Sequence, residues 1–302
     1  MKVIMEHRVL VIGLDGATWN IVDQLFKQGS MPFVKRLTDS GFRSVLRSTI
    51  PPISGPAWLS LATGMNPGKL GVFDFFNRRR GRNGLSPINS QDYKGKALWD
   101  LLGSLGFKVG IFNYPMLYPP YALNGFMVSG VGCPDCNKLT YPPSLKLKLD
   151  QVAGGYEVEL DYQHERYDDC DLFLTDLNRL IEKQEKAVYY LLKREEWDVF
   201  IAVFSFTDWA QHLMWRHLEK QHPLYDKTLS PKYQAAFARL WKKVDSIIQN
   251  MMQISDNEIN VFVLSDHGFG SQRGCFNLVS WMNDRGYIVR KRPTKERLVG
   301  LF

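Results

Sequence analysis

Stretches of continuous apolar residues alternate along the chain with stretches in which apolar residues recur every three or four positions. Continuous runs are typical of strands buried on both faces of a parallel sheet, and the wider spacing is typical of helices with one buried face. The runs predict strands over residues 8–14, 108–113, 197–206 and 259–264, and a further strand is expected over residues 42–49, ahead of Pro51 and Pro52. The spaced patterns predict helices over residues 20–28, 31–40, 54–62, 96–105, 169–195, 231–253 and 277–285.

This alternation of strands and helices predicts an α/β fold with a doubly wound, mostly parallel sheet flanked by helices. The length of 302 residues suits one large domain, and we expect residues 1–302 to form it. Residues 114–168 interrupt the alternation, and within them residues 124–149 are rich in Pro, Gly and Cys. We therefore expect an irregular excursion there.

The net charge of +7 is concentrated in two basic runs, over residues 77–82 and 290–297. Neither run interleaves with aromatic residues, so we do not expect nucleic acid as a partner. A solvated loop and a solvated tail are the simplest interpretation. The alternative is that the first run lies near an active-site mouth and attracts a phosphorylated substrate.

Two further features bound the class of protein. No apolar run reaches the roughly 18 residues of a membrane-spanning helix, and the N-terminal residues make a poor secretory signal, so we expect a cytoplasmic protein. The four cysteines are unevenly spaced. A disulfide framework is therefore not expected, and the pair Cys133 and Cys136 lacks a second pair to complete a zinc site.

Polar side chains that can bind metal ions follow three of the predicted strands. Asp15 follows the first strand, Asp208 and His212 follow the fourth, and Asp266 and His267 follow the last. Ligands of open α/β sheets bind outside the carboxyl ends of the strands, so we expect these side chains to converge. Carboxylate and imidazole groups together suit zinc or manganese.

Ser54 is the candidate nucleophile, at the start of the helix predicted over residues 54–62. A serine hydroxyl bound to a cation ionises more readily, and a helix start directs backbone N–H groups towards an anion. Two cations about 4 Å apart would stabilise both oxygens of an in-line displacement at phosphorus. The plainer alternative is that Asp15, Ser54 and Asp208 only cap helices, with His212 in the core.

Four motifs follow one another in a family-specific order: VIGLDGATW, PPISGPAWLSLATGMNPGKLGVFDF, TDWAQHLMWR and LSDHGFG. On these motifs the chain resembles the alkaline phosphatase superfamily, on the branch of type I phosphodiesterases and nucleotide pyrophosphatases. Within that branch it most resembles the predicted phosphohydrolase/phosphomutase group. The resemblance covers about residues 8–286.

The resemblance implies two bound divalent cations, with zinc as the first expectation and manganese as the alternative. It implies one ligand set that includes the nucleophile and a second set on the helix after the fourth strand. The first set comprises Asp15, Ser54, Asp266 and His267, and the second comprises Asp208 and His212. In such enzymes the nucleophile takes up the phosphoryl group, and water then removes it.

The chain departs from the family pattern in two places. Ala57 stands where phosphodiesterase relatives usually carry an Asn that contacts phosphate, so a backbone donor such as that of Gly55 would have to serve. The relatives also complete the second ligand set with a distant downstream His. This chain ends 35 residues after His267, and neither His217 nor His222 matches that position. We therefore expect that the C-terminal part of the usual domain is missing.

Two hypotheses about function follow. The first is a metal-dependent hydrolase of phosphate mono- or diesters that acts on a small phosphorylated substrate through a covalent phosphoserine at Ser54. Sulfatase activity ranks lower, because the stretch SGPAW lacks the Arg of the sulfatase pattern. The second is a catalytically incomplete module that binds a phosphorylated ligand or a partner protein. Missing structure would expose apolar surface, so self-association or a separate C-terminal half is also expected.

Overall fold

The computed structural model describes residues 7–77, 85–160, 167, 169–255 and 259–289. The chain divides into two compact units between Phe269 and Gly270. The first unit contains the sheet and all the candidate site residues. In the described part of the second unit the regular element is helix α10 (Leu278–Asp284). Each unit is described by itself, and the expectation of one domain over the whole chain stays a prediction.

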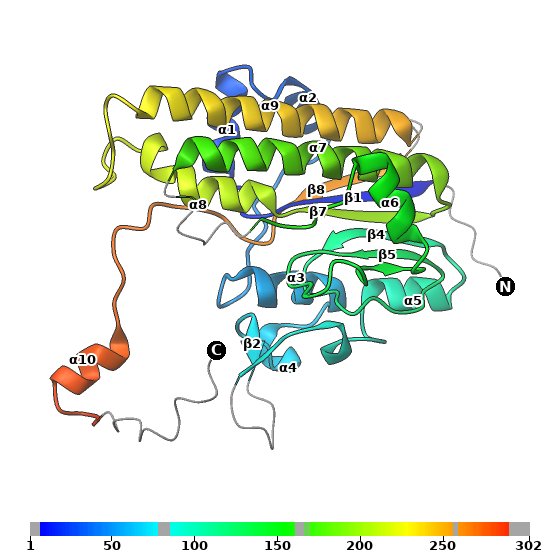
Figure 1. Cartoon of the computed structure of the whole chain (residues 1–302), viewed down its shortest axis with the longest axis horizontal. Helices are drawn as coiled ribbons and strands as arrows, with labels where there is room; N and C mark the ends of the chain where they lie inside the picture. Colours follow the sequence, from blue (N-terminus) through cyan, green and yellow to red (C-terminus); the bar gives the residue numbers. More distant parts are fainter. Residues whose placement is uncertain (1–6, 78–84, 161–166, 168, 256–258, 290–302) are drawn as a thin grey trace. The chain divides into compact units, whose positions relative to one another are not determined.

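A six-stranded sheet forms the centre of the first unit, with the strand order β6-β5-β4-β7-β1-β8 (Figure 1). All neighbouring strands are parallel except β5 and β6, which are antiparallel. The strands are β1 (Arg8–Leu14), β4 (Val109–Tyr114), β5 (Gly125–Ser129), β6 (Thr140–Tyr141), β7 (Val199–Phe204) and β8 (Ile259–Leu264). The prediction of a mostly parallel α/β sheet is confirmed.

Helices cover both faces of the sheet, and β7 shows why. Phe200, Ala202 and Phe204 of this strand pack into one apolar cluster, whereas the alternate residues pack into a second cluster. Side chains of a strand point alternately to opposite faces, so a strand buried on both faces is apolar throughout. In Figure 1 the long helices lie on one side of the sheet, and α3 and α5 lie on the other.

The first apolar cluster contains residues of α1 (Trp19–Lys27), α2 (Pro32–Ser40), α6 (Leu145–Ala153), α7 (Cys170–Arg194), α8 (Phe206–Leu218) and α9 (Ser230–Ile254). The second contains residues of α3 (Ser54–Thr63) and α5 (Leu98–Ser104). The short elements that follow α3 are α4 (Pro67–Leu70), β2 (Phe76–Asn77), β3 (Ser86–Pro87) and η1 (Ser90–Asp92).

The strand predicted over residues 42–49 is wrong. This segment follows α2 without regular secondary structure, and Phe42 and Val45 are 93% and 80% exposed. Its backbone is held by single side chains instead of a ladder: Trp19 Nε1 donates to Ser44 O at 2.9 Å. A segment forms a strand only where a partner strand is available, and within the described residues none pairs with this one.

The irregular excursion expected over residues 114–168 is also wrong in part. It contains β5, β6 and α6, and β5 extends the parallel sheet beside β4. One of the glycines in this Pro-, Gly- and Cys-rich segment, Gly125, is required by the pairing of β5 with β4. A Cβ atom at Gly125 would lie 2.1 Å from the backbone oxygen of Val109, so only glycine allows β5 to start this close to β4.

Asp245 of α9 offers a test of how the helical layer is held together. Its buried carboxylate accepts hydrogen bonds from the backbone N–H groups of Phe33 at 3.1 Å and Val34 at 2.7 Å, in the first turn of α2. Asp245→Ala leaves both donors without this partner, so we expect the free energy of unfolding to fall by about 1–3 kcal/mol in denaturant titrations. Asp245→Asn retains one acceptor oxygen and should lose less. Equal losses in the two variants would contradict this capping role.

Candidate active site

The parallel register of the sheet brings Asp15 and Asp266 to one edge. Gly13 of β1 pairs with Leu264 of β8, so both strands end at the same level. Asp15 follows β1 directly, and Gly16 then turns the chain with a positive φ of 68°. The backbone N–H of Gly16 donates to Asp266 Oδ1 at 3.1 Å. The ends of two neighbouring strands are therefore joined by a side chain that is itself a candidate ligand.

Helix α8 brings the third carboxylate to the same edge. The helix begins immediately after β7, and β7 lies on the other side of β1 from β8. Asp208 lies buried in its first turn, and His212, one turn later, has a side chain that is 48% exposed. His212 Nε2 lies 3.3 Å from Asp208 Oδ2. The spacing of four residues therefore places both groups on one face of the helix, as expected.

Ser54 is the first residue of α3 and faces the same group from the opposite side of the sheet. Its hydroxyl lies 2.9 Å from His267 Nε2 and 3.3 Å from Asp15 Oδ1. Ile53 occupies the N-cap position of α3, so Ser54 does not cap this helix. The caps of α1 and α8 are Thr18 and Ser205. The alternative in which the candidate residues only cap helices therefore does not describe these positions.

His267 has a defined orientation. Its Nδ1 lies 2.8 Å from the backbone oxygen of Gly268, which can only accept, so Nδ1 donates. In the neutral ring Nε2 is then left with a free lone pair. This atom lies near Ser54 Oγ and also near two carboxylates, at 3.3 Å from Asp266 Oδ2 and 3.6 Å from Asp15 Oδ1. A carbonyl that fixes one ring nitrogen is the usual arrangement for a histidine that binds a metal through the other.

Three carboxylates in a buried setting need positive charge nearby. Burial raises the pKa of Asp15 well above its ordinary value, and the charges of Asp266 and Asp208 raise it further. Burial also raises the pKa of Asp266. Within the described residues, Asp208 Oδ1 and Asp266 Oδ2 are buried and accept no hydrogen bond. Buried carboxylate oxygens that accept no hydrogen bond are what a cation site presents, so the residues fit a divalent cation.

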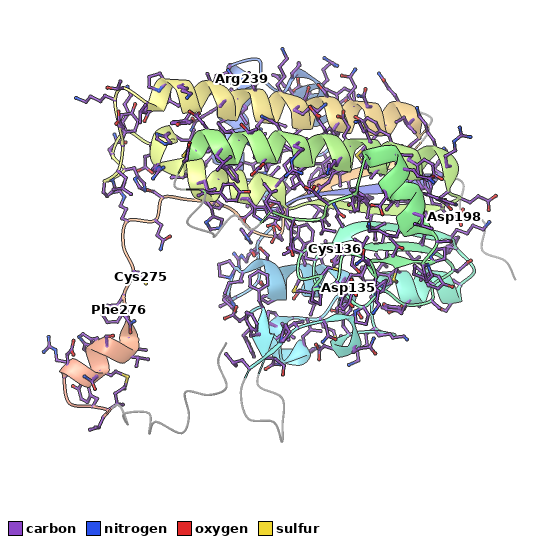
Figure 2. All side chains as sticks on the ribbon, in the orientation of Figure 1. Asp135, Cys136, Asp198, Arg239, Cys275 and Phe276 are labelled. Atoms are coloured by element: carbon purple, nitrogen blue, oxygen red, sulfur yellow. The ribbon has the colours of Figure 1, made fainter. Side chains whose placement is uncertain are left out.

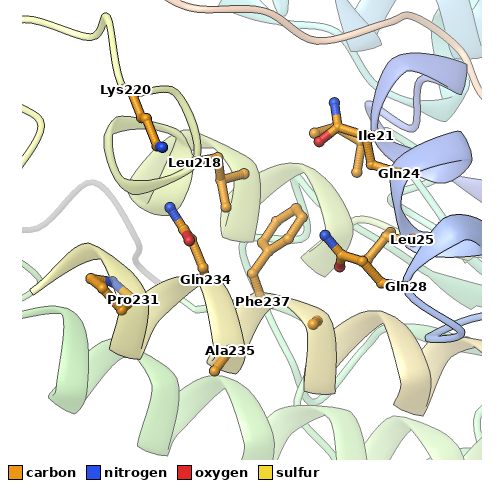
Figure 3. Close-up of a pocket in the computed structure, with 11 residues that line it drawn as sticks. Ile21, Gln24, Leu25, Gln28, Leu218, Lys220, Pro231, Gln234, Ala235 and Phe237 are labelled. Carbon is orange, nitrogen blue, oxygen red and sulfur yellow. The ribbon is translucent and has the colours of Figure 1, made fainter. Parts of the chain in front are cut away.

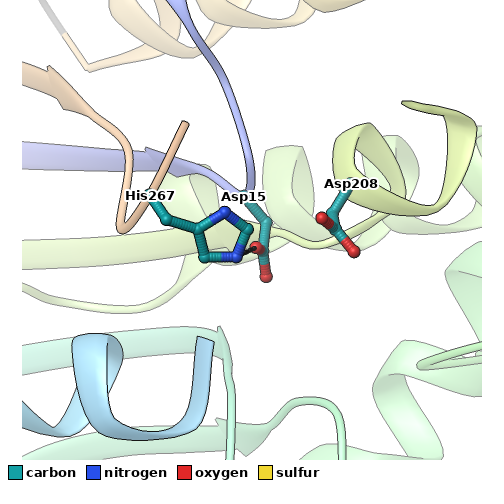
Figure 4. A group of neighbouring side chains, drawn as sticks. All are labelled: Asp15, Asp208 and His267. Atoms are coloured by element: carbon teal, nitrogen blue, oxygen red, sulfur yellow. Dashed lines mark ion pairs between the residues drawn. The ribbon is translucent and has the colours of Figure 1, made fainter. Parts of the chain in front are cut away.

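Figure 4 shows Asp15, Asp208 and His267, which offer ligand atoms that all lie within 4.8 Å of one another. Among the described residues this is the one group of at least three such side chains. Ser54 and Asp266 contact its members, and His212 contacts Asp208. The structure thus brings all six predicted metal and nucleophile residues into one connected group.

The remaining sequence candidates lie as follows. Gly55 is buried in the first turn of α3, where backbone N–H groups have no partner within the helix. His217 lies near the far end of α8 and contacts Ser230 Oγ at 3.2 Å, consistent with its exclusion from the site. Cys133 and Cys136 are free thiols, and Cys136 is labelled in Figure 2.

Sequence reasoning missed two neutral groups around Asp15. Trp58 Nε1 donates to Asp15 Oδ2 at 3.2 Å, and Gln211 Nε2 donates to the backbone oxygen of Gly16 at 3.0 Å. Helical spacing alone indicates only core packing for Trp58. Its position four residues after Ser54, like that of Gln211 three residues after Asp208, places each on the same helix face as a candidate ligand. That spacing was the available signal.

A separate groove of about 480 Å³ lies between α1, the end of α8 and the start of α9 (Figure 3). Its polar lining includes Gln24, Gln28, Gln234 and Lys220, above an apolar floor that includes Phe237. It contains none of the six candidate site residues.

No helix among the described residues is long and apolar enough to cross a membrane.

The fold and this group of side chains define a class: α/β proteins with a group of carboxylates and an imidazole that could hold a cation at the carboxyl edge of a parallel sheet. A family profile for type I phosphodiesterase / nucleotide pyrophosphatase matches residues 9–300, and the chain belongs to that family. The resemblance read from the four motifs is thereby confirmed.

Two solved structures of phosphonoacetate hydrolase from Sinorhizobium meliloti 1021 are similar to this chain. They are complexes with phosphonoformate and phosphonoacetate, with sequence identities of 18% and 17% and a TM-score of 0.48 for each. The similarity covers 87% of this chain and 57% of each of those chains, so this chain spans little more than half of their length. A search of curated proteins gave no match.

The crowding of carboxylates predicts an unusual response to Asp15→Asn. Because the pKa of Asp15 is raised in the folded state, its ionisation destabilises the metal-free fold as the pH rises through that value. The neutral variant should therefore unfold a few degrees above the metal-free wild type near neutral pH, at about 2–4 °C for each kcal/mol. The difference should shrink towards pH of about 4, where the wild-type group is protonated.

Thermal unfolding of chelator-treated protein across this pH range measures the effect. Asp39→Asn is the control, because Asp39 is exposed in an ion pair with Lys35. A lower midpoint for Asp15→Asn at neutral pH would contradict the repulsion on which the cation site depends.

Proposed function

We propose that the protein is a metal-dependent hydrolase of phosphate mono- or diesters that acts through a covalent phosphoserine at Ser54. The observation that carries this proposal is the position of the Ser54 hydroxyl, 2.9 Å from His267 Nε2 at the start of α3 and beside the buried carboxylates. A phosphoserine mechanism needs a hydroxyl that a bound cation can activate, and an anion-binding environment for the phosphoryl group. Family membership supports the same reaction class.

The proposed ligand sets follow the family pattern. Asp15, Ser54, Asp266 and His267 would hold one cation, and Asp208 and His212 would hold the other. The group of Asp15, Asp208 and His267 spans both sets, as expected where two cations lie about 4 Å apart. When bound, zinc or manganese would lower the pKa of the Ser54 hydroxyl and offset negative charge on the phosphoryl group.

The protein's own groups divide the remaining work. The Ser54 Oγ–phosphorus bond forms as the bond from phosphorus to the leaving alkoxide breaks, and the proton lost by the serine hydroxyl is balanced by protonation of the leaving alkoxide from solvent. Water then cleaves the Oγ–phosphorus bond, which restores the Ser54 hydroxyl and releases phosphate from a monoester or a phosphate monoester from a diester. The first-turn N–H groups of α3, that of Gly55 included, would hold phosphoryl oxygens in place of the Asn that Ala57 replaces. The substrate class is a small phosphorylated compound, with no nucleic acid expected.

The second candidate function is a catalytically incomplete module that binds a phosphorylated ligand. The observation in its favour is that the set on α8 offers two side chains, Asp208 and His212, whereas structural and catalytic zinc sites use three or four protein ligands. Metal stoichiometry separates the two functions. Zinc as the cation, self-association, a separate C-terminal half and a cytoplasmic location stay predictions.

Ser54→Ala tests the nucleophile. We expect turnover of aryl phosphate mono- or diesters to fall by about three orders of magnitude or more, because no other hydroxyl would replace the attacking oxygen. Ser60→Ala is the matched control, since Ser60 lies on the same helix and its hydroxyl has no hydrogen-bond partner. The control should retain the wild-type rate.

Elemental analysis accompanies these assays. About two cations per wild-type chain, together with loss of turnover in Ser54→Ala, would support the hydrolase. Fewer than one cation, with no turnover after zinc or manganese is added, would instead favour the binding module.

A further inference from the structure

Gln211 is a buried side chain for which the proposed reaction has no chemical use. It lies on α8 between Asp208 and His212 and is fully inaccessible to solvent. Its Nε2 donates to two backbone oxygens, that of Gly16 at 3.0 Å and that of Thr207 at 3.1 Å. Both N–H groups of the amide are therefore used, and their acceptors lie on two different elements.

The hydrogen bond from Gln211 ends on Gly16, the residue whose backbone N–H also bonds the Asp266 carboxylate. The N–H of Gly16 holds Asp266 after β8, and its carbonyl is held by Gln211 on α8. The backbone oxygen of Asp15, the preceding residue, accepts a hydrogen bond from Thr207 Oγ1 at 2.7 Å. The short turn after β1 is thus bonded to the carboxylate of Asp266 and to α8, the helix that carries Asp208. These two carboxylates belong to the two proposed ligand sets.

Little space remains around this turn. A Cβ atom on Gly16 would lie 2.9 Å from Asp208 Oδ1 and 3.2 Å from Gln211 Nε2. The positive φ of Gly16 places its carbonyl towards α8. A shift of α8 along the sheet edge would therefore either break the Gln211 bond or push Asp208 against the turn.

The amide is a poor choice for packing alone. Gln211 Oε1 is buried and has no hydrogen-bond partner in the part of the chain that the structure describes, which lowers stability relative to an apolar side chain of the same length. A glutamate would turn an anionic oxygen towards two carbonyl oxygens, and a methionine would donate nothing. Only a side chain with two N–H donors can bond to both carbonyls. The glutamine amide is therefore explained by its link between the turn after β1 and α8.

We infer that Gln211 is a positioning residue that fixes the Asp208–His212 ligand set relative to the set that contains Asp15 and Asp266. This inference rests on the proposed cation site. Gln211 does not touch the reacting atoms; it acts through the backbone of Gly16 and through the first turn of α8. Its removal should weaken cation binding while the fold persists.

The test compares Gln211→Met with Gln184→Met by calorimetric titration of chelator-treated protein with zinc and with manganese. Gln184 is the matched control: it is a buried helical glutamine on α7 whose Nε2 donates to a backbone oxygen, that of Val158 at 2.8 Å. We expect Gln211→Met to bind cations about 10–100-fold more weakly than wild type, the usual effect of losing an outer-shell contact. Gln184→Met should bind as wild type does.

A second pair of variants covers the case in which Gln211→Met does not fold. Thr207→Val removes the hydroxyl that reaches Asp15 O, and Thr207→Ser retains it. Weakened binding in the Val variant, restored in the Ser variant, would support the same link. Wild-type affinity in folded Gln211→Met, or in Thr207→Val where Gln211→Met does not fold, would overturn the inference while the hydrolase proposal stands. A wild-type protein that binds no cation would remove both.

Discussion

The crowding of three buried carboxylates at one sheet edge is the constraint on which the rest of this structure depends. Asp15, Asp208 and Asp266 come from three different elements, and two of them leave an oxygen without a hydrogen-bond partner. Such a group is costly in a fold that only has to be stable, because burial and like charges both disfavour ionisation. A bound cation reverses the sign of this interaction. The arrangement costs stability in the metal-free fold and fits the cation site that we propose.

The parallel sheet is what makes this crowding possible without distorting the backbone. Strands β7, β1 and β8 are neighbours and parallel, so their carboxyl ends lie at one level and their following residues meet. Antiparallel neighbours would send alternate chain ends to opposite edges. Helix α3, on the opposite face from the long helices, then supplies Ser54 to the same edge. Each layer of the fold contributes at least one group.

The sequence predicted the elements that depend on continuous burial and missed those that depend on a partner. The bounds of β1 and β8 are as predicted, because both segments are mostly apolar, although Asn260 interrupts β8 and none of its residues is fully buried. Residues 42–49 include Phe42, Val45 and Leu46, but no strand of the described chain lies beside them, and β5 was hidden by the glycine that its pairing requires. Pairing is a non-local property, so local composition cannot report it.

The same difference between local and non-local information applies to the candidate site. Charged residues that directly follow apolar strands stand out in a sequence, because a buried strand end rarely carries an unpaired charge. The convergence of Asp15, Asp266 and His267 was predictable on that ground, whereas their chemical roles stay predictions. Trp58 and Gln211 are neutral groups on helices, where an aromatic or amide side chain has many ordinary uses. Only the folded structure shows which carbonyl or carboxylate each of them meets.

Trp58 shows how closely the core and the site are connected. Its ring is fully buried, packs edge-on against Tyr114 at a centroid distance of 5.8 Å, and has its backbone oxygen bound by Tyr114 Oη at 2.5 Å. The indole N–H donates a hydrogen bond to Asp15 Oδ2, and Asp15 Oδ1 faces Ser54 and His267. The carboxylate is thus presented in one orientation by a residue whose position is fixed by core packing. Because the core is rigid and close-packed, the direction of the Asp15 ligand atom is set before any cation binds.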